Sequence, residues 1–170
     1  AGGQHRDGDA PTNSGDTQTC VTNTARGALN SLKLSPTATQ ASTLGGTLNF
    51  TTVLTTGPGG ILFDGTAAST TISGSTITGS VASTDLVIYP GHTTASVGTL
   101  TINSVIGTNL ATVTKAGPDT LILGGNNTFT GALRVNEGTV SFATVAATAT
   151  AQPTGAGTIT LGGNAKTGTL

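Results

Sequence analysis

The stretch from Thr114 to Val140, TKAGPDTLILGGNNTFTGALRVNEGTV, decides the fold of this chain. Runs such as TLIL at 120–123 and LRV at 133–135 alternate apolar and polar residues, which is the period of a β-strand. The GGNN sequence at 124–127 separates these runs with residues that favour turns. The stretch therefore predicts strands of three to five residues joined by turns.

The stretch ends in Gly138-Thr139-Val140, one copy of a motif that recurs along the chain. Gly-Thr followed by a branched apolar residue also stands at 46–48, 98–100, 157–159 and 168–170. Repeated short strands are typical of a solenoid, in which each coil adds one strand to each parallel sheet. We therefore predict an all-β parallel β-helix (β-solenoid) of about seven or eight coils, with roughly 20–25 residues per coil and a length of about 35 Å. An antiparallel sandwich is the main alternative, but the Asn-Gly and Asp-Gly hairpin turns that it prefers are scarce.

Composition favours an exported all-β protein. Thr makes up roughly a fifth of the 170 residues, 26 residues are Gly, and only 8% are charged. Thr, Val and Ile favour strands, and a hydrophobic fraction of 35% argues against a disordered chain. The net charge of −1 offers no basic surface for nucleic acid. No apolar run approaches the ~20 residues of a membrane-spanning helix, so we expect no membrane insertion of this segment.

The chain divides into an arm and one domain. Residues 1–16 (AGGQHRDGDAPTNSGD) lack any periodicity and are predicted to form a flexible polar arm. Residues 17–170 are predicted to form a single β-helix domain, whose strongest repeat match spans 98–140. Cys20 is the single cysteine, which excludes an internal disulfide and a Cys-rich zinc site.

The segment from Thr114 to Val140 resembles the autotransporter-associated β-strand repeat, also called the passenger-associated transport repeat. That repeat combines a Lys-x-Gly-x-Gly-Thr-Leu strand, a Gly-x-Asn-Thr-Tyr-Thr-Gly turn and a Val-Asn-x-Gly-Thr-Leu strand. The sequence departs from this pattern at Asp119 and at 132–134. The resemblance implies a right-handed parallel β-helix on a secreted or cell-surface bacterial passenger, without a shared chemistry. The residues that carry the repeat are Lys115, Gly117, Leu121, Leu123, Gly125, Asn127, Thr128, Phe129, Thr130, Gly131, Val135, Gly138 and Val140.

The sequence predicts neither catalysis nor metal binding. Glycoside hydrolysis needs two carboxylates held close together, whereas the acidic residues outside the arm are isolated. They are Asp64, Asp85, Asp119 and Glu137. Asp64 and Asp85 lie about one coil apart and could stack, but isolated acids on such a rod are more often solvated turn residues. In the arm Asp7, Asp9 and Asp16 lack the bidentate Glu of a calcium loop, and His5 and His92 lack a second ligand at metal spacing. We therefore expect no enzyme, no cofactor and no metal site.

The resemblance and the repeats favour a structural extracellular module: a surface stalk or adhesin segment, or the subunit of a head-to-tail filament. A β-helix has an open sheet edge at each end, and an open edge can pair with another chain. The candidate assembly residues are Thr17, Thr19, Cys20 and Val21 at one end, and Gly168, Thr169 and Leu170 at the other. The expected partners are copies of this chain or flanking repeats of a longer passenger, with a glycan as a further candidate.

Two other functions stay open. One is carbohydrate binding or polysaccharide processing, which other parallel β-helices perform. The other is ice binding by ranked threonines on a flat face of the helix. The Thr-x-Thr pairs that suggest it stand at 76/78, 99/101, 112/114, 128/130 and 158/160, and their irregular spacing argues against a single rank.

Overall fold

The computed structural model describes residues 59–64, 69–74, 76–79, 84–91, 97–143, 154–162 and 168–169, together with five earlier strands between 18 and 50. The regular elements in these ranges are all β-strands. They are β1 (Gln18–Cys20), β2 (Ala28–Leu29), β3 (Ser31–Leu34), β4 (Gln40–Leu44), β5 (Leu48–Phe50), β6 (Gly59–Phe63), β7 (Ser69–Gly74), β8 (Thr76–Gly79), β9 (Thr84–Pro90), β10 (Thr99–Ile102), β11 (Val105–Ile106), β12 (Leu110–Lys115), β13 (Thr120–Leu123), β14 (Ala132–Val135), β15 (Gly138–Phe142), β16 (Ile159–Leu161) and β17 (Gly168–Thr169). Among the described residues, none belongs to a helix long and apolar enough to span a bilayer.

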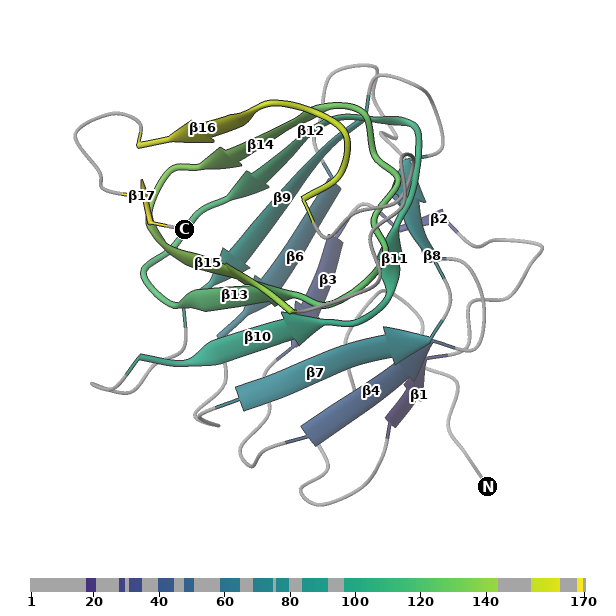
Figure 1. Ribbon diagram of the computed structural model, residues 1–170. Helices are drawn as coiled ribbons and strands as arrows, with labels where there is room; N and C mark the ends of the chain where they lie inside the picture. The colour runs from purple at the N-terminus through teal and green to yellow at the C-terminus, as the bar shows by residue number, and fades with distance from the viewer. Residues whose placement is uncertain are drawn as a thin grey trace.

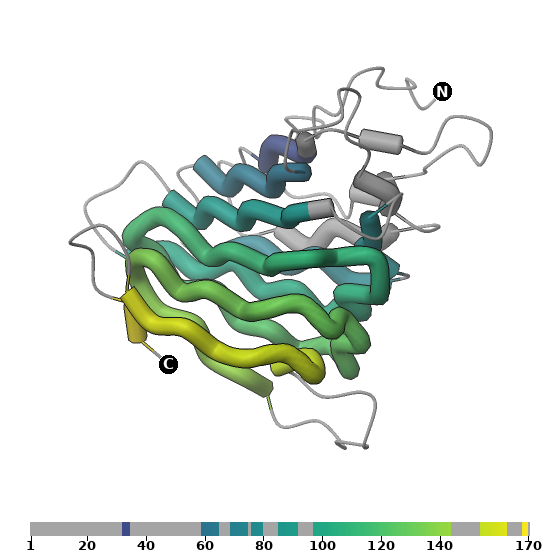
Figure 2. The backbone as a smooth tube through the Cα atoms, turned by 90° about the horizontal axis from the view of Figure 1, so that it is seen from above, coloured from purple at the N-terminus to yellow at the C-terminus, as the bar shows by residue number. Residues whose placement is uncertain are grey.

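The strands form three parallel sheets that the chain visits in turn (Figure 1). The seven-stranded sheet has the order β1-β4-β7-β10-β13-β15-β17, and the six-stranded sheet has the order β16-β14-β12-β9-β6-β3. The four-stranded sheet has the order β11-β8-β5-β2. Each of its strands follows a strand of the seven-stranded sheet in the sequence and precedes one of the six-stranded sheet. Figure 2 shows the successive turns as stacked rungs. The parallel pairing is that of a β-solenoid, and it rules out the antiparallel sandwich.

The coils differ in length, and the predicted coil count is not confirmed. Thr99 pairs with Ser69, 30 residues earlier, but with Thr120, only 21 residues later. Seven strands in one sheet and six in another correspond to six circuits and the opening of a seventh among the described strands. At about 4.8 Å per rung, six circuits extend about 29 Å. Several coils exceed the expected 20–25 residues, so the described strands form fewer rungs than the seven or eight predicted.

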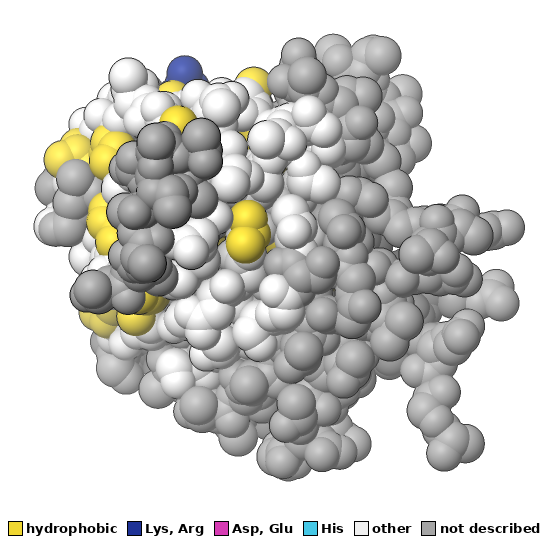
Figure 3. Space-filling view, turned by 45° about the vertical axis from the view of Figure 1, so that its right-hand side comes forward, with side chains coloured by type: hydrophobic (Ala, Val, Ile, Leu, Met, Phe, Trp, Pro, Cys, Tyr) yellow, Lys and Arg dark blue, Asp and Glu magenta, His cyan; other side chains and the backbone are white. Residues whose placement is uncertain are grey.

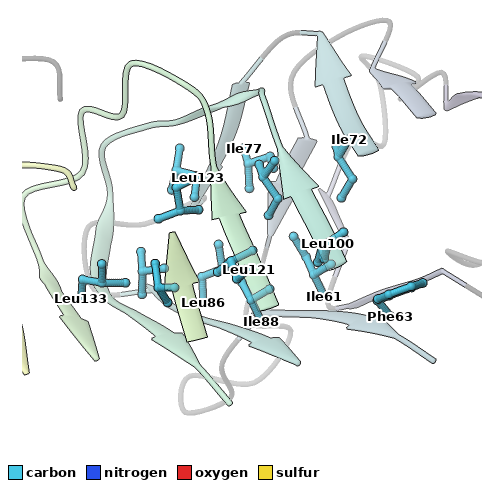
Figure 4. Packing of buried hydrophobic residues seen from close by; sticks show 14 of the residues in the cluster. Ile61, Phe63, Ile72, Ile77, Leu86, Ile88, Leu100, Leu121, Leu123 and Leu133 are labelled. Carbon is cyan, nitrogen blue, oxygen red and sulfur yellow. The ribbon is translucent and has the colours of Figure 1, made fainter. Parts of the chain in front are cut away.

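The core is a column of apolar side chains enclosed by the sheets (Figure 4). Strand β10 alternates half-buried Thr99 and Thr101 with fully buried Leu100 and Ile102, and β13 repeats this pattern. Because the register places Leu100 beside Leu121 and Ile102 beside Leu123, buried residues of successive coils stack. Each buried aliphatic side chain contributes about 1.5–3 kcal/mol of hydrophobic stabilisation. The predicted inward and outward alternation is therefore present in β6, β8, β10, β13 and β14.

The predicted domain division stays a prediction. The arm at residues 1–16 lies outside the described residues, as do several connections between strands. The described strands from β1 to β17 belong to one continuous stack of parallel pairings.

Candidate functional site

The repeat segment places the charged side chain of Lys115 in a column of the apolar core. Lys115 ends β12 and pairs with Ile88 on β9 and with Val135 on β14. It is fully buried, with 0% of its surface exposed. The other members of its column in the six-stranded sheet are apolar: Leu32, Ile61, Ile88, Val135 and Leu161. A lysine thus occupies a position that every other coil fills with a hydrocarbon side chain.

The ammonium group of Lys115 is held by backbone carbonyls. Its Nζ donates hydrogen bonds to the carbonyl oxygens of Ala116 at 3.2 Å, Gly117 at 2.6 Å and Glu137 at 2.9 Å. Glu137 belongs to the next coil, so the three bonds join two rungs at one corner of the solenoid. We name residues Lys115, Ala116, Gly117, Glu137 and Gly138 the Lys115 corner.

Two glycines make the Lys115 corner sterically feasible. Gly117 and Gly138 adopt φ angles of 82° and 71°, in the left-handed region that side chains with a Cβ disfavour. A Cβ on Gly138 would lie 2.6 Å from the carbonyl oxygen of Asp119, closer than such atoms normally approach. The spacing of Lys115, Gly117 and Gly138 in the repeat therefore reflects one tight backbone corner.

Burial lowers the pKa of Lys115 from 10.5 to about 8, because desolvation penalises the charged form. The carboxylates of Asp119 and Glu137 act in the opposite direction and raise this pKa. Asp119 is itself buried, at 3% exposure. The corner therefore holds a cation whose charge is opposed by burial and supported by two acidic residues and three carbonyl oxygens.

This pKa predicts a stability change at alkaline pH. Between about pH 8 and pH 10.5 the folded chain releases the Lys115 proton while the unfolded chain still holds it. The unfolded state then binds more protons, so the free energy of unfolding should rise with pH across this window. Urea unfolding followed by circular dichroism at each pH measures the effect. The Lys115→Met variant should lack this rise, and equal slopes for the two chains would refute the assignment.

A second buried polar residue ends the four-stranded sheet. Asn127 is 1% exposed, and its Oδ1 accepts a hydrogen bond from the backbone N–H of Ile106 at 2.8 Å. Ile106 lies in β11, the outermost strand of that sheet. Its carbonyl oxygen accepts from the N–H of Thr128 at 2.9 Å. Among the described strands, none pairs with the outer edge of β11. The Asn127 amide oxygen therefore supplies the acceptor that a further strand would provide.

The turn after Asn127 is closed by an aromatic ring and by glycines. Phe129 is fully buried, and a Cβ on Gly155 would lie 2.6 Å from its ring atoms. At the same corner a Cβ on Gly131 would meet the backbone of Ala111, and one on Gly157 would meet the backbone of Gly131. The glycines therefore let three successive coils approach closely, and the Phe129 ring fills the aromatic position of the repeat.

Removing the Asn127 amide should destabilise the fold. We expect Asn127→Ala to lower the free energy of unfolding by about 1–3 kcal/mol, because a buried N–H of Ile106 loses its acceptor. Asn126→Ala is the matched control, since Asn126 is the exposed neighbour in the same turn. Chemical denaturation of both variants measures the difference. Equal stability of the two variants would contradict the capping role.

Asp64 and Asp85 do not lie close together. Asp64 follows β6 and Asp85 lies near the start of β9, at opposite ends of neighbouring strands, about 20 Å apart at about 3.3 Å per residue. The stacking that the sequence left open for this pair is therefore absent. Asp64 instead makes a 3.0 Å ion pair with Lys33. The described part of the chain holds no group of three or more His, Cys, Asp or Glu placed to bind a metal. Asp7, Asp9, Asp16, His5 and His92 lie outside the described residues.

The candidate assembly residues lie at the two edges of the seven-stranded sheet. Thr19 and Cys20 belong to β1 at one edge, and Gly168 and Thr169 form β17 at the other. The remaining candidates, Thr17, Val21 and Leu170, lie outside the described residues. The two segments predicted from the sequence therefore include the opposite edge strands of this sheet. Their role in assembly stays a prediction.

The predicted Thr-x-Thr pairs do not share one face. The pair at 76/78 lies on β8, the pair at 112/114 on β12, and the pair at 128/130 in a turn. Thr160 lies on β16, whereas Thr99 and Thr101 lie on β10 in the seven-stranded sheet. Sequence spacing alone missed the residues that do line up with Thr99 and Thr101, because coils of 19 to 30 residues hide the register.

The comparisons with known proteins agree with the repeat. Residues 113–142 match the family model of the passenger-associated-transport-repeat, which confirms the resemblance seen at Thr114 to Val140. Neither a curated protein nor a solved structure matches the chain. The repeat points to an autotransporter passenger region, and hence to a secreted or cell-surface location. Such passengers are usually non-catalytic.

Proposed function

We propose that this chain is a structural module of an extracellular passenger: a right-handed β-helical segment of a surface stalk or adhesin that joins further coils at its open edges. The observation that carries the proposal is the unbroken series of parallel pairings along the stack, with buried side chains in register. We favour a right-handed helix because crossovers between parallel strands of one sheet are right-handed in almost every known case.

The surface supports a role in architecture more than one in chemistry. On the face in Figure 3 the described side chains are mostly uncharged polar groups, with a few hydrophobic ones among them. A surface with few charges attracts neither nucleic acid nor an anionic membrane. The buried polar groups at Lys115 and Asn127 are bonded to backbone atoms and stabilise turns.

The outer strand β16 supports stacking of a further coil. Ile159 pairs with buried Leu133, and Leu161 pairs with buried Val135, so both continue core columns. They are nevertheless 37% and 50% exposed. An edge strand with exposed apolar side chains is a template for another strand. A further coil on β16, from a neighbouring copy or from a flanking repeat, would bury both residues.

Light scattering distinguishes the two sources of that coil. A head-to-tail filament requires the mass of the purified chain to grow with concentration. Leu161→Lys should then suppress growth by placing a charge on the open core column, while Thr160→Lys, on the outward side of the same strand, should not. Deleting residues 1–24, which include β1, should also suppress it. If the chain stays monomeric at every concentration, the filament is rejected, and the chain is instead a segment of a longer passenger. Specific binding on a glycan array would favour the carbohydrate alternative.

A further inference from the structure

The outer face of the seven-stranded sheet carries a regular array of hydroxyl groups. Its first column follows the register of β7, β10, β13, β15 and β17 and contains Ser69, Thr99, Thr120, Thr139 and Thr169. The second column, two residues further along each strand, contains Thr71, Thr101, Ile122 and Ser141. Eight of these nine positions bear a hydroxyl, and none bears a charge. We name these eight Ser and Thr residues the hydroxyl rank.

Buried residues of the same strands fix the position of the hydroxyl rank. Each rank residue on β10 and β13 is half-buried and alternates with a fully buried leucine or isoleucine. Thr has a branched Cβ, which restricts its χ1 angle and keeps its hydroxyl and methyl groups in few orientations. The rank is therefore a fixed surface whose groups repeat about every 4.8 Å across the strands and about every 6.6 Å along them.

Strand propensity alone does not explain this arrangement. The six-stranded sheet belongs to the same coils, and its corresponding outward column contains Gly60, Val87, Thr114, Arg134 and Thr160. A preference for β-branched residues would act on both sheets equally. The uncharged hydroxyl columns are specific to the seven-stranded sheet, whose strands β7, β10, β13 and β15 lie side by side in Figure 1.

We propose that the hydroxyl rank binds the surface of ice. The face of an ice crystal presents water oxygens on a fixed two-dimensional lattice, and the rank presents its hydroxyl groups at fixed repeats of about 4.8 Å and about 6.6 Å. A rigid array loses little entropy on contact, and waters ordered between its hydroxyl and methyl groups can join the lattice. Charged side chains would hold their own hydration shells and disturb that order. This activity is independent of the proposed structural role, because it uses a sheet face and no strand edge.

Inhibition of ice recrystallisation by the purified 170-residue chain tests the proposal. We expect the folded chain to slow the growth of ice grains. Thr101→Tyr, at the centre of the rank, and Ser141→Tyr, at an exposed position of the rank, should each weaken inhibition about tenfold by preventing close contact. Thr114→Tyr, on the outward face of the six-stranded sheet, is the matched control and should act as the unmodified chain does. The folded chain failing to inhibit, or Thr114→Tyr losing as much activity as the rank variants, would overturn the proposal.

Discussion

Replacing Phe129 by alanine should lower the free energy of unfolding by about 3–5 kcal/mol, the largest stability loss that we expect from one substitution here. The ring is fully buried in the turn of the repeat, and the backbone of Gly155 lies against it. The carbonyl of Phe129 also accepts from the N–H of Ala156 at 2.9 Å. Removing the ring therefore leaves a cavity between two successive coils.

Phe142→Ala is the control for this substitution. Phe142 ends β15 and is only partly buried, although it packs against the same core. Its loss should cost about 1–2 kcal/mol, in proportion to the smaller apolar area that it removes from water. Urea denaturation of both variants compares them directly. If the two variants lose equal stability, the turn around Phe129 is not the anchor that its burial indicates.

Lys115→Ala should cost about 2–5 kcal/mol, comparable with the truncation of a buried aliphatic side chain. The variant opens a cavity between Ile88 and Val135 and removes the donor from three carbonyl oxygens. Lys115→Met retains most of the side-chain volume, and a substitution that conserves volume in a core is expected to cost less than about 1.5 kcal/mol. Both variants remove the donor from the three carbonyl oxygens, so the difference between them measures the packing of the lysine stem.

The two Lys115 variants separate packing from charge. A large loss in the alanine variant with a small one in the methionine variant assigns most of the stability to the stem of the lysine. A large loss in both would assign it to the ammonium group and its three hydrogen bonds, contrary to our expectation. Thermal and urea unfolding at pH 7 distinguish these results.

The fold class was predictable because alternation acts within a single strand. Runs such as TLTI at 99–102 and TLIL at 120–123 reveal buried and outward positions without any knowledge of neighbouring coils. The coil count was less predictable. The Gly-Thr motif at 98–100 and 138–140 opens strands of the seven-stranded sheet, whereas the copy at 157–159 opens a strand of the six-stranded sheet. Copies of one motif therefore do not mark one position per coil.

The candidate site needed the register as well as the sequence. The contact between Lys115 and the carbonyl of Glu137 spans 22 residues, and that between Asn127 and Ile106 spans 21. The separation of these partners depends on the lengths of the intervening turns, which vary from coil to coil. For the same reason the sequence left open whether Asp64 and Asp85 stack, and the hydroxyl rank is visible only when the strands are aligned.

Cross-linking of engineered cysteine pairs tests the central claim, the parallel register of successive coils, most directly. In a Cys20→Ser background, Thr99→Cys with Thr120→Cys places two cysteines on paired residues of β10 and β13, about 4.8 Å apart between Cα atoms. Thr99→Cys with Ile122→Cys moves one of them two residues along the strand, to about 8 Å, beyond the reach of a disulfide. Mild oxidation followed by mass spectrometry should find a disulfide in the first pair and free thiols in the second. Cross-linking of the second pair as readily as the first, or of neither, would contradict the parallel solenoid.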